Sequence, residues 1–399
     1  MTGPFSHPRR PRRAGPLAAA ALALAALVTG ATAAAAAPAG AGIRVAFCPD
    51  AAGPFSVQGT KVVDGGGKTF VSYGITVPGL LGPNWSKFVQ LDLEKIGATA
   101  LAWCGNTVRL QLSQDDLLGA SGTGLNKAYL NAIQNEVAAA ISDDLVVVLN
   151  DSTEDTPQRN VQKGPDQATE TFWKDLAKLY GNNPQVIFDL FNEPRTYSPG
   201  MSTAQEWRLW SNGGWFDGVF YPIGMAQLAQ YVRTTLGAQN LFWIEGPDNS
   251  DSFAGMASQH AVLKVSGVVY ALHHPAGPHD AAVWNADFGY LVSTGVAPVV
   301  DGEWTNYEPA PTSHPTAPRS SCWPDAPTAV PAYLRYLAAH GIGLNAYQLQ
   351  PGYLIKSYGN LAAPTTIDAA TWSCQSAAER QPDQGAGSQL MSWFKQHDS

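Results

Sequence analysis

The stretch Val186-Ile187-Phe188-Asp189-Leu190-Phe191-Asn192-Glu193-Pro194-Arg195 is an apolar run that ends in an adjacent amide and carboxylate. The run has the composition of a buried strand, and Pro194 ends it because proline lacks the backbone N–H that a sheet requires. The core of a strand has no structural use for Asn192 and Glu193 at its carboxyl end. We therefore expect the pair at the rim of a sheet, with Glu193 as a candidate catalytic acid.

Similar apolar runs recur along the chain and alternate with segments of helical periodicity. The eight expected strands are residues 70–77, 107–112, 145–149, 185–191, 241–245, 267–273, 297–303 and 343–349. The expected helices include residues 125–141, 169–180, 223–236, 329–340 and 388–397. Eight strand-then-helix units with polar residues at strand ends predict an α/β fold, a (β/α)8 TIM barrel, although doubly wound sheets share this alternation. Glycine turns within residues 55–68 predict a short N-terminal β-hairpin.

The N-terminus has the pattern of a secretory signal peptide over residues 1–37. Four arginines, an apolar run at residues 16–28 and small residues through Ala37 follow one another. The run is shorter than the roughly 20 residues that cross a bilayer, so we favour a cleaved leader over a membrane anchor. Twin-arginine export is a minority alternative, because proline and glycine stand where that signal needs apolar residues. We expect residues 38–54 to be a short segment, residues 55–399 to be one domain, and the mature protein to be secreted, without a membrane partner.

Charge and cysteine content limit the possible partners. Without the leader arginines, 20 basic residues stand against 32 acidic ones, a net charge near minus 12 that disfavours nucleic acid. Cys48, Cys104, Cys322 and Cys374 would meet an oxidising compartment and allow three pairings. Our first choice joins Cys322 to Cys374, which flank the last expected strand. Their spacing is not that of a metal site, so we expect no metal there.

A second carboxylate closes another apolar strand, in Ala297-Pro-Val-Val-Asp-Gly-Glu303-Trp304. Glycoside hydrolysis uses two carboxyl groups, one to protonate the leaving oxygen and one to attack the anomeric carbon or activate water. Glu303 taken alone would equally suit a rim salt bridge. The sequence lacks the Gly-x-Ser-x-Gly motif of serine hydrolases, and His273 and His274 would point to opposite faces of a strand, which argues against metal-dependent hydrolysis. We expect no cofactor and no metal.

These motifs resemble glycoside hydrolase family 5, the cellulase family of retaining barrels, over residues 55–350. The chain has the family's Asn-Glu-Pro after one strand, Gly-Glu after another, an arginine in Gly105-Asn-Thr-Val-Arg109-Leu and a histidine in Val268-Val-Tyr-Ala-Leu-His273. The resemblance implies Glu193 as acid/base, Glu303 as nucleophile and Asn192 on the sugar 2-hydroxyl. It also implies that Arg109 steadies Glu303 and that His273 lines the cleft. A neighbouring arginine would lower the pKa of Glu303, whereas apolar surroundings and the Glu303 charge would raise that of Glu193.

Three strand ends depart from the family pattern. The sixth has His273-His274-Pro275, where the family places a tyrosine on the nucleophile, and the candidate substitutes are His274, His279 and Tyr270. The third lacks a histidine. Its Asn150, Asp151 and Glu154 suit either sugar hydroxyls or an Asx turn. The eighth lacks a tryptophan, and Tyr347 or Gln350 would take its place.

Aromatic side chains provide further candidates, because an aromatic ring stacks on the C–H face of a sugar. The chain has 12 tryptophans; the expected platforms are Trp304, Trp215, Trp243 and Trp323, and Trp173 and Trp393 are expected to pack helices. Glu245, which ends the fifth strand, suits either a sugar contact or a structural acid.

The sequence thus predicts a secreted retaining glycoside hydrolase with a polysaccharide or oligosaccharide partner. A β-linked glucan is the first choice of substrate and a β-mannan the second, and we expect a monomer. The alternative is a non-catalytic carbohydrate-binding barrel with a remodelled site. The presence of both glutamates favours the enzyme.

Overall fold

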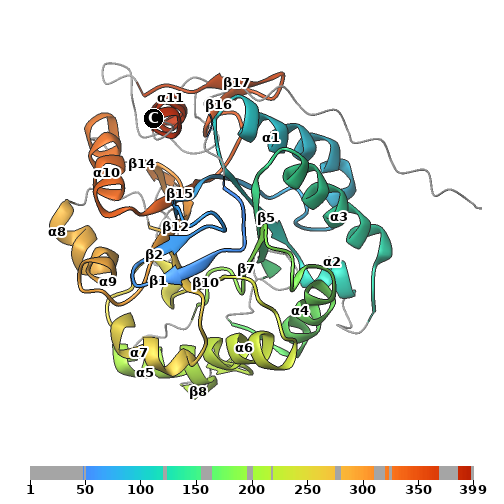
Figure 1. Cartoon of the computed structure of the whole chain (residues 1–399), viewed down its shortest axis with the longest axis vertical. Helices are drawn as coiled ribbons and strands as arrows, with labels where there is room; N and C mark the ends of the chain where they lie inside the picture. Colours follow the sequence, from blue (N-terminus) through green and yellow to red (C-terminus); the bar gives the residue numbers. More distant parts are fainter. Residues whose placement is uncertain are drawn as a thin grey trace, which may run out of the picture. The chain divides into compact units, whose positions relative to one another are not determined.

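Eight apolar runs of the sequence form a closed barrel of parallel strands (Figure 1). In barrel order they are β4 (Tyr73–Val77), β5 (Thr107–Leu112), β6 (Val146–Asp151), β7 (Val186–Asp189), β10 (Phe242–Glu245), β11 (Val268–Leu272), β12 (Val299–Trp304) and β15 (Gly343–Ala346). The computed structural model describes residues 48, 51–119, 124–153, 164–195, 201–216, 219–274, 280–309, 320–322, 326–367 and 385–396, all within Ala41–Ser399. Pairing of β15 with β4 closes the ring, so the predicted TIM barrel is confirmed.

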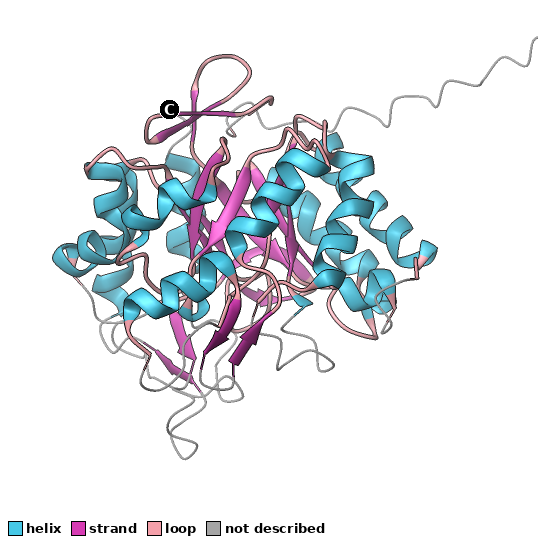
Figure 2. Cartoon of the chain, turned by 90° about the horizontal axis from the view of Figure 1, so that it is seen from below, coloured by secondary structure: helices cyan, strands magenta, loops and turns pink. Residues whose placement is uncertain are grey.

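Helices surround the strands, as Figures 1 and 2 show. They are α1 (Val89–Leu101), α2 (Gln114–Leu118), α3 (Lys127–Ser142), α4 (Gln167–Tyr180), α5 (Thr203–Asn212), α6 (Met225–Gln230), α7 (Met256–Leu263), α8 (Ala281–Trp284), α9 (Tyr290–Ser293), α10 (Ala326–His340) and α11 (Gly387–Gln396). Polar caps begin several of them: Asp166 accepts hydrogen bonds from the Ala168 and Thr169 backbones at the start of α4. Among the described residues, no helix is both long and apolar enough to cross a membrane.

Side chains alternate between the barrel interior and the layer under the helices. On β5, Val108 and Leu110 belong to the large apolar cluster that packs against the helices. On β6 the neighbours of opposite parity, Val146 and Val148, belong to a second cluster that fills the interior together with Ile187 of β7. This alternation follows from the two-residue period of a strand. Polar residues that share the interior parity must therefore lie inside the barrel.

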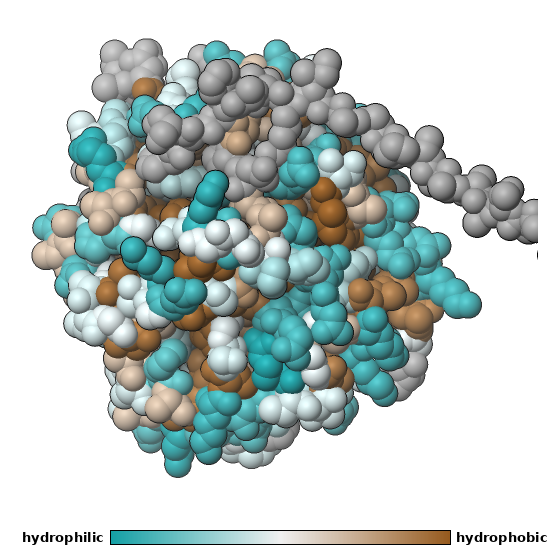
Figure 3. Space-filling view, in the orientation of Figure 1, coloured by the Kyte–Doolittle hydropathy of each residue, from teal (hydrophilic) through white to brown (hydrophobic). Residues whose placement is uncertain are grey.

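The predicted N-terminal hairpin exists and gains a third strand. Strands β1 (Ser56–Gln58), β2 (Lys61–Val63) and β3 (Thr69–Phe70) form an antiparallel sheet that lies across the barrel in Figure 1. Val62 and Phe70 are buried with the interior cluster, so the sheet closes the amino-terminal end of the barrel. The same face in Figure 3 shows apolar residues scattered among polar ones.

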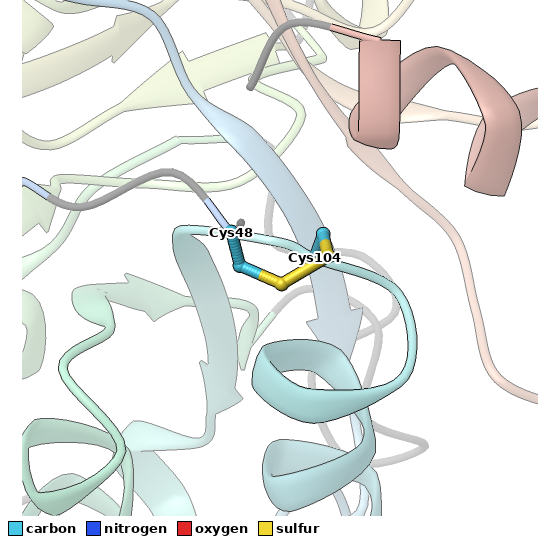
Figure 4. The surroundings of a disulfide bond; sticks show 2 residues. All are labelled: Cys48 and Cys104. Carbon is cyan, nitrogen blue, oxygen red and sulfur yellow. A yellow bond between two sulfur atoms is a disulfide. The ribbon is translucent and has the colours of Figure 1, made fainter. Parts of the chain in front are cut away.

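A disulfide joins Cys48 to Cys104 across a sequence separation of 56 residues (Figure 4). Cys104 lies in the turn between α1 and β5, so the bond ties the N-terminal segment to this end of the barrel. The bond is compatible with the predicted pairing of Cys322 with Cys374. Cys374 lies outside the described residues, so that pairing stays a prediction.

Short hairpins decorate the barrel outside its strands. The segment 196–221 contains α5 and the strands β8 (Gly214–Phe216) and β9 (Val219–Tyr221). In the segment around residues 308–327, β13 (Tyr307–Pro309) pairs with β14 (Ser320–Cys322). This pairing suits a rim loop rather than a linker. A further pair, β16 (Ile355–Ser357) and β17 (Asn360–Pro364), follows the last barrel strand and was not expected.

Candidate active site

Arg109 lies at the centre of the site and is completely buried on β5. Its Nε donates to Asp189 Oδ2 at 2.8 Å and its Nη1 to Glu303 Oε2 at 2.6 Å. Its Nη2 donates to Asn192 Oδ1 at 2.5 Å and to Glu245 Oε1 at 3.0 Å. A planar guanidinium with five N–H donors suits this role, which a lysine ammonium could not fill. The strand ends predicted from the sequence therefore converge on one buried cation.

Glu303 faces the interior because β12 is irregular. The register between β12 and β15 shifts between Asp301 and Trp304, as a β-bulge requires. Asp301 faces the helix layer, where its Oδ2 accepts from the Tyr333 hydroxyl at 2.6 Å. Strict alternation would also turn Glu303 outward. The bulge instead places Glu303 against Arg109 and gives Trp304 the outward position.

Glu193 lies just beyond β7 with its backbone in the left-handed region, at φ 43°. A residue other than glycine seldom adopts this conformation, and here the Glu193 N–H donates to Glu245 Oε2 at 2.6 Å. The Glu193 carboxylate lies 3.1 Å from His273 Nδ1 through Oε1 and 3.5 Å from Arg195 Nη2 through Oε2. His273 Nε2 lies 3.2 Å from Glu245 Oε1. Glu245 is thus the structural acid that holds both Glu193 and His273.

The two candidate catalytic carboxylates lie close together. Each of Glu193, His273 and Glu303 offers one atom that could bind a metal ion, and these three atoms lie within 4.8 Å of one another. These three are the described residues that could share a metal ion, but the Arg109 guanidinium on Glu303 opposes a cation at this place. Short separation of two carboxyl groups, one of them bound to an arginine, suits double displacement at an anomeric carbon.

The pKa directions of the two glutamates are the reverse of those expected. Burial would raise the pKa of Glu193, but the hydrogen bond and charge of His273, followed by the charge of Arg195, bring that pKa below its ordinary value. Burial raises the pKa of Glu303, and the charges of Arg109 and His273 offset only part of that rise. Burial opposes a charged His273, but Glu245 and Glu193 raise the His273 pKa well above its ordinary value. The resting site therefore stores a proton on His273, next to Glu193.

Comparison with known proteins identifies the barrel. The family described as Cellulase (glycosyl hydrolase family 5) matches residues 63–351, which is more than half of the chain. The chain belongs to glycosyl hydrolase family 5. Endoglucanase 5 of Pectobacterium carotovorum subsp. carotovorum is 26% identical over 275 residues, which cover 68% of this chain and 48% of that relative. An endoglucanase of Paenibacillus polymyxa is 26% identical over 316 residues, 63% of this chain and 71% of the relative.

Solved structures share the fold of this family 5 barrel. A beta-glucanase from Saccharophagus degradans in complex with cellotetraose superposes with a TM-score of 0.56 at 18% identity, covering 88% of this chain and 94% of that chain. A beta-mannanase from Streptomyces thermolilacinus with mannohexaose gives a TM-score of 0.52 at 19% identity, covering 75% and 84%. Identities this low establish the common fold alone.

Two buried polar residues of the family 5 site escaped the sequence prediction. Gln111 Nε2 donates to Glu303 Oε2 at 2.9 Å, and Asp189 accepts from Arg109. Both have the interior parity of their strands, as Arg109 has. The signal available in the sequence was a polar residue near a candidate site residue inside a largely apolar strand: Gln111 lies two positions after Arg109, and Asp189 lies three before Asn192.

Two of the three proposed substitutes for the missing tyrosine, Tyr270 and His274, do not reach Glu303. Tyr270 faces the helix layer, where its hydroxyl lies 2.7 Å from His260 Nδ1. His274 also faces outward and stacks on Tyr333 with ring centroids 5.5 Å apart. The prediction that His274 binds substrate is therefore wrong, because the interior parity belongs to His273. His279 lies outside the described residues.

The tryptophan predictions are partly wrong. Trp304 is completely buried and stacks on Tyr333 in the helix layer, since the bulge of β12 turns it away from the cleft. Trp243 is buried inside the barrel, so neither ring offers a free face to a sugar. Trp215 on β8 is 68% exposed and stays a candidate platform. Trp323 lies outside the described residues. Trp173 and Trp393 pack in the core as expected.

The third strand end is a polar turn. Asp151 Oδ1 accepts from the Thr153 backbone N–H at 3.2 Å and from the Thr153 hydroxyl, which is an Asx-turn arrangement. Asn150 Oδ1 accepts from the Ser152 hydroxyl. Asp151 therefore has the structural role, and Glu154 lies outside the described residues.

The eighth strand end places Tyr347 just after β15. Tyr347 is half-buried, and its backbone N–H donates to the Trp304 carbonyl at 2.7 Å. Its ring lies 6.0 Å from that of Tyr353. Its predicted contact with substrate stays a prediction.

Proposed function

We propose that this chain is a secreted, retaining glycoside hydrolase that cleaves a β-linked polysaccharide by double displacement. The observation that carries the proposal is the short separation of Glu193 and Glu303, whose nearest donor atoms fall within 4.8 Å. Retaining enzymes hold their two carboxyl groups about 5–5.5 Å apart, whereas inverting enzymes need about 6.5–9.5 Å to admit a water. The spacing favours direct attack by a carboxylate.

In the first step, Glu303 attacks the anomeric carbon and the glycosidic C–O bond breaks. Glu193 receives a proton from His273 through their 3.1 Å contact and passes it to the leaving oxygen, so that Glu193 is a carboxylate when the glycosyl-enzyme has formed. In the second step, Glu193 removes a proton from water, the water oxygen bonds to the anomeric carbon, and Glu303 departs as a carboxylate. The net reaction adds one water across the bond and retains the anomeric configuration.

The surrounding residues hold these groups in place. Arg109 keeps the departing carboxylate of Glu303 paired with a positive charge in both steps. The Asn192 oxygen accepts from Arg109, and we assign the Asn192 amide group to the sugar 2-hydroxyl. Among the described residues, Trp215 is the best exposed aromatic platform for a more distant sugar.

The substrate proposal follows the relatives. Several curated relatives are endoglucanases, and similar folds were solved with cellotetraose and with mannohexaose. We therefore place β-glucan first and β-mannan second. Secretion is proposed from the leader pattern of residues 1–37, which lie outside the described residues, and is tested by N-terminal sequencing of protein from the culture medium.

The central test is hydrolysis of soluble β-glucan, β-mannan and xylan by the wild type, Glu303→Gln and Glu193→Gln. We expect turnover of at least one polysaccharide with retention at the new reducing end by NMR, and its loss in Glu303→Gln. Glu94→Gln, an exposed glutamate on α1, is the matched control and should keep full activity. Sugar binding without any turnover by the wild type would instead support a non-catalytic carbohydrate-binding barrel. Retained activity in Glu303→Gln would refute the nucleophile assignment.

A further inference from the structure

Gln111 makes a direct contact with the proposed nucleophile. It is the next interior residue after Arg109 on β5, is 1% exposed, and donates from Nε2 to Glu303 Oε2 at 2.9 Å. Arg109 Nη1 donates to the same oxygen at 2.6 Å. Among the described residues, Glu303 Oε1 accepts no hydrogen bond. The two donors therefore distinguish one carboxylate oxygen from the other.

The other end of the Gln111 amide is unsatisfied. Its Oε1 is buried and has no hydrogen-bond partner within the described part of the chain. A buried acceptor without a partner costs free energy, which a bound donor would recover. The Gln111 side chain thus has its donor committed to Glu303 and its acceptor available beside the same carboxylate.

A second unsatisfied amide lies on the neighbouring strand. Asn150 of β6 is the register partner of Gln111, and its Nδ2 is buried without a hydrogen-bond partner among the described residues. Its Oδ1 is occupied by the Ser152 hydroxyl. An unsatisfied acceptor and an unsatisfied donor on adjacent strands match an alcohol, which both donates and accepts.

We propose that Gln111 is a positioning residue that holds Glu303 Oε2, so that Oε1 attacks the anomeric carbon, and that Gln111 together with Asn150 binds one hydroxyl of the attacked sugar. The inference rests on the proposed function and deepens it, because it assigns the attacking oxygen and a hydroxyl-binding pair. The bond that forms is Glu303 Oε1 to the anomeric carbon, and the bond that breaks is the glycosidic C–O.

Loss of the Gln111 donor has a predictable kinetic signature. A hydrogen bond to the carboxylate favours its charged form, so its removal raises the pKa of Glu303. The acidic limb of kcat/KM must then move to higher pH. The same donor stabilises Glu303 as it leaves the glycosyl-enzyme, so breakdown of that intermediate should slow and a burst of the first product should appear.

The first experiment compares Gln111→Met with the wild type on an aryl β-glycoside that the wild type hydrolyses. We expect kcat/KM to fall 10- to 100-fold and the acidic limb to move up by about one pH unit, with a burst. Gln114→Met on α2 is the matched control, since Gln114 is equally buried but accepts from Thr169 outside the barrel. The Gln114→Met variant should have a lower Tm than the wild type, and the acidic limb of its kcat/KM profile should not move. An unmoved limb in Gln111→Met would overturn the positioning role.

The second experiment tests the hydroxyl site with substrates that lack one hydroxyl each. At one position of the attacked sugar, the deoxy substrate should cost the wild type at least 10-fold in kcat/KM and cost Gln111→Met and Asn150→Ala at most 2-fold. Equal losses for all three proteins at every position would overturn the site. A wild type that hydrolyses nothing would refute the proposed function itself. Turnover that depends on Glu303 but not on Gln111 would refute only the present inference.

Discussion

Replacing Asp151 with asparagine should flatten the dependence of stability on pH. Asp151 is completely buried at the end of β6, and its Oδ2 has no hydrogen-bond partner among the described residues. Burial raises its pKa from 3.8 to about 8, against the opposing effect of the Thr153 hydrogen bond. The Asp151 carbonyl accepts from the Asn192 N–H at 2.8 Å, so this turn also supports the active site.

The sign of the effect follows from which state binds the proton. The folded chain keeps the Asp151 proton up to about pH 8, whereas the unfolded chain loses it near pH 3.9. The stabilising contribution is therefore complete below the unfolded pKa and is lost as pH rises toward the folded pKa. Each pH unit in this window costs about 1.4 kcal/mol, so the wild type should lose about 2.7 kcal/mol through this group between pH 5 and 7.

Urea unfolding at pH 5, 6, 7 and 8 measures this difference. The neutral amide of Asp151→Asn imitates the protonated acid and does not titrate. The free energy of unfolding of the variant, relative to that of the wild type, should therefore rise by about 2.7 kcal/mol from pH 5 to 7. Asp144→Asn is the control, because Asp144 is exposed and adopts a left-handed conformation that asparagine tolerates. Its curve should parallel that of the wild type. Parallel curves for Asp151→Asn and the wild type would refute the reasoning.

Three further predictions test the site and the fold. Arg109→Lys keeps the charge but loses the four-way contact, so kcat should fall at least 100-fold and unfolding should become easier by about 3–5 kcal/mol; a change in KM alone would contradict this. Trp304→Phe should cost about 1–2 kcal/mol in urea unfolding and leave KM within about twofold, because the indole packs in the core; a large rise in KM with unchanged stability would restore its role as a platform. Replacing Cys48 and Cys104 by alanine should cost about 4 kcal/mol, as expected for a closed loop of this length, and activity well below the transition should not change; an unshifted Tm would show that the bond adds no stability.

The barrel could be predicted because its strands are apolar on both faces. A parallel strand buried between an interior and a helix layer appears as a short continuous hydrophobic run, and each of the eight runs contains or overlaps a barrel strand. The ends of these runs also revealed Asn192, Glu193 and Glu303, since polar residues at such positions serve no packing purpose, whereas Arg109 was predicted from the family resemblance. Parity along each strand would further have placed Gln111 and Asp189 inside and Tyr270 outside.

Other features could not be predicted because they depend on the meeting of distant segments. The outward position of Trp304 requires the bulge of β12, which no local pattern in Val-Val-Asp-Gly-Glu-Trp demands. The reversed pKa directions arise because His273, just after β11, lies between Glu193, just after β7, and Glu245, the last residue of β10. The bond from Cys48 to Cys104 depends on where the N-terminal segment crosses the barrel end.

The site contains two kinds of residue: those on regular strand backbone and those on irregular backbone. Arg109, Gln111, Asp189 and Glu245 occupy ordinary interior positions, where strand geometry and packing hold them rigidly. The proposed catalytic pair lies on irregular backbone: Glu193 has a left-handed conformation and Glu303 lies at a bulge. Irregular backbone at a functional position persists only where the surrounding structure holds it in place. Here the residues on regular strands hold it. Glu245 accepts from the Glu193 N–H, and Arg109 and Gln111 both donate to Glu303. Substitutions in the regular set should therefore impair catalysis by displacing the glutamates, even where they touch no substrate.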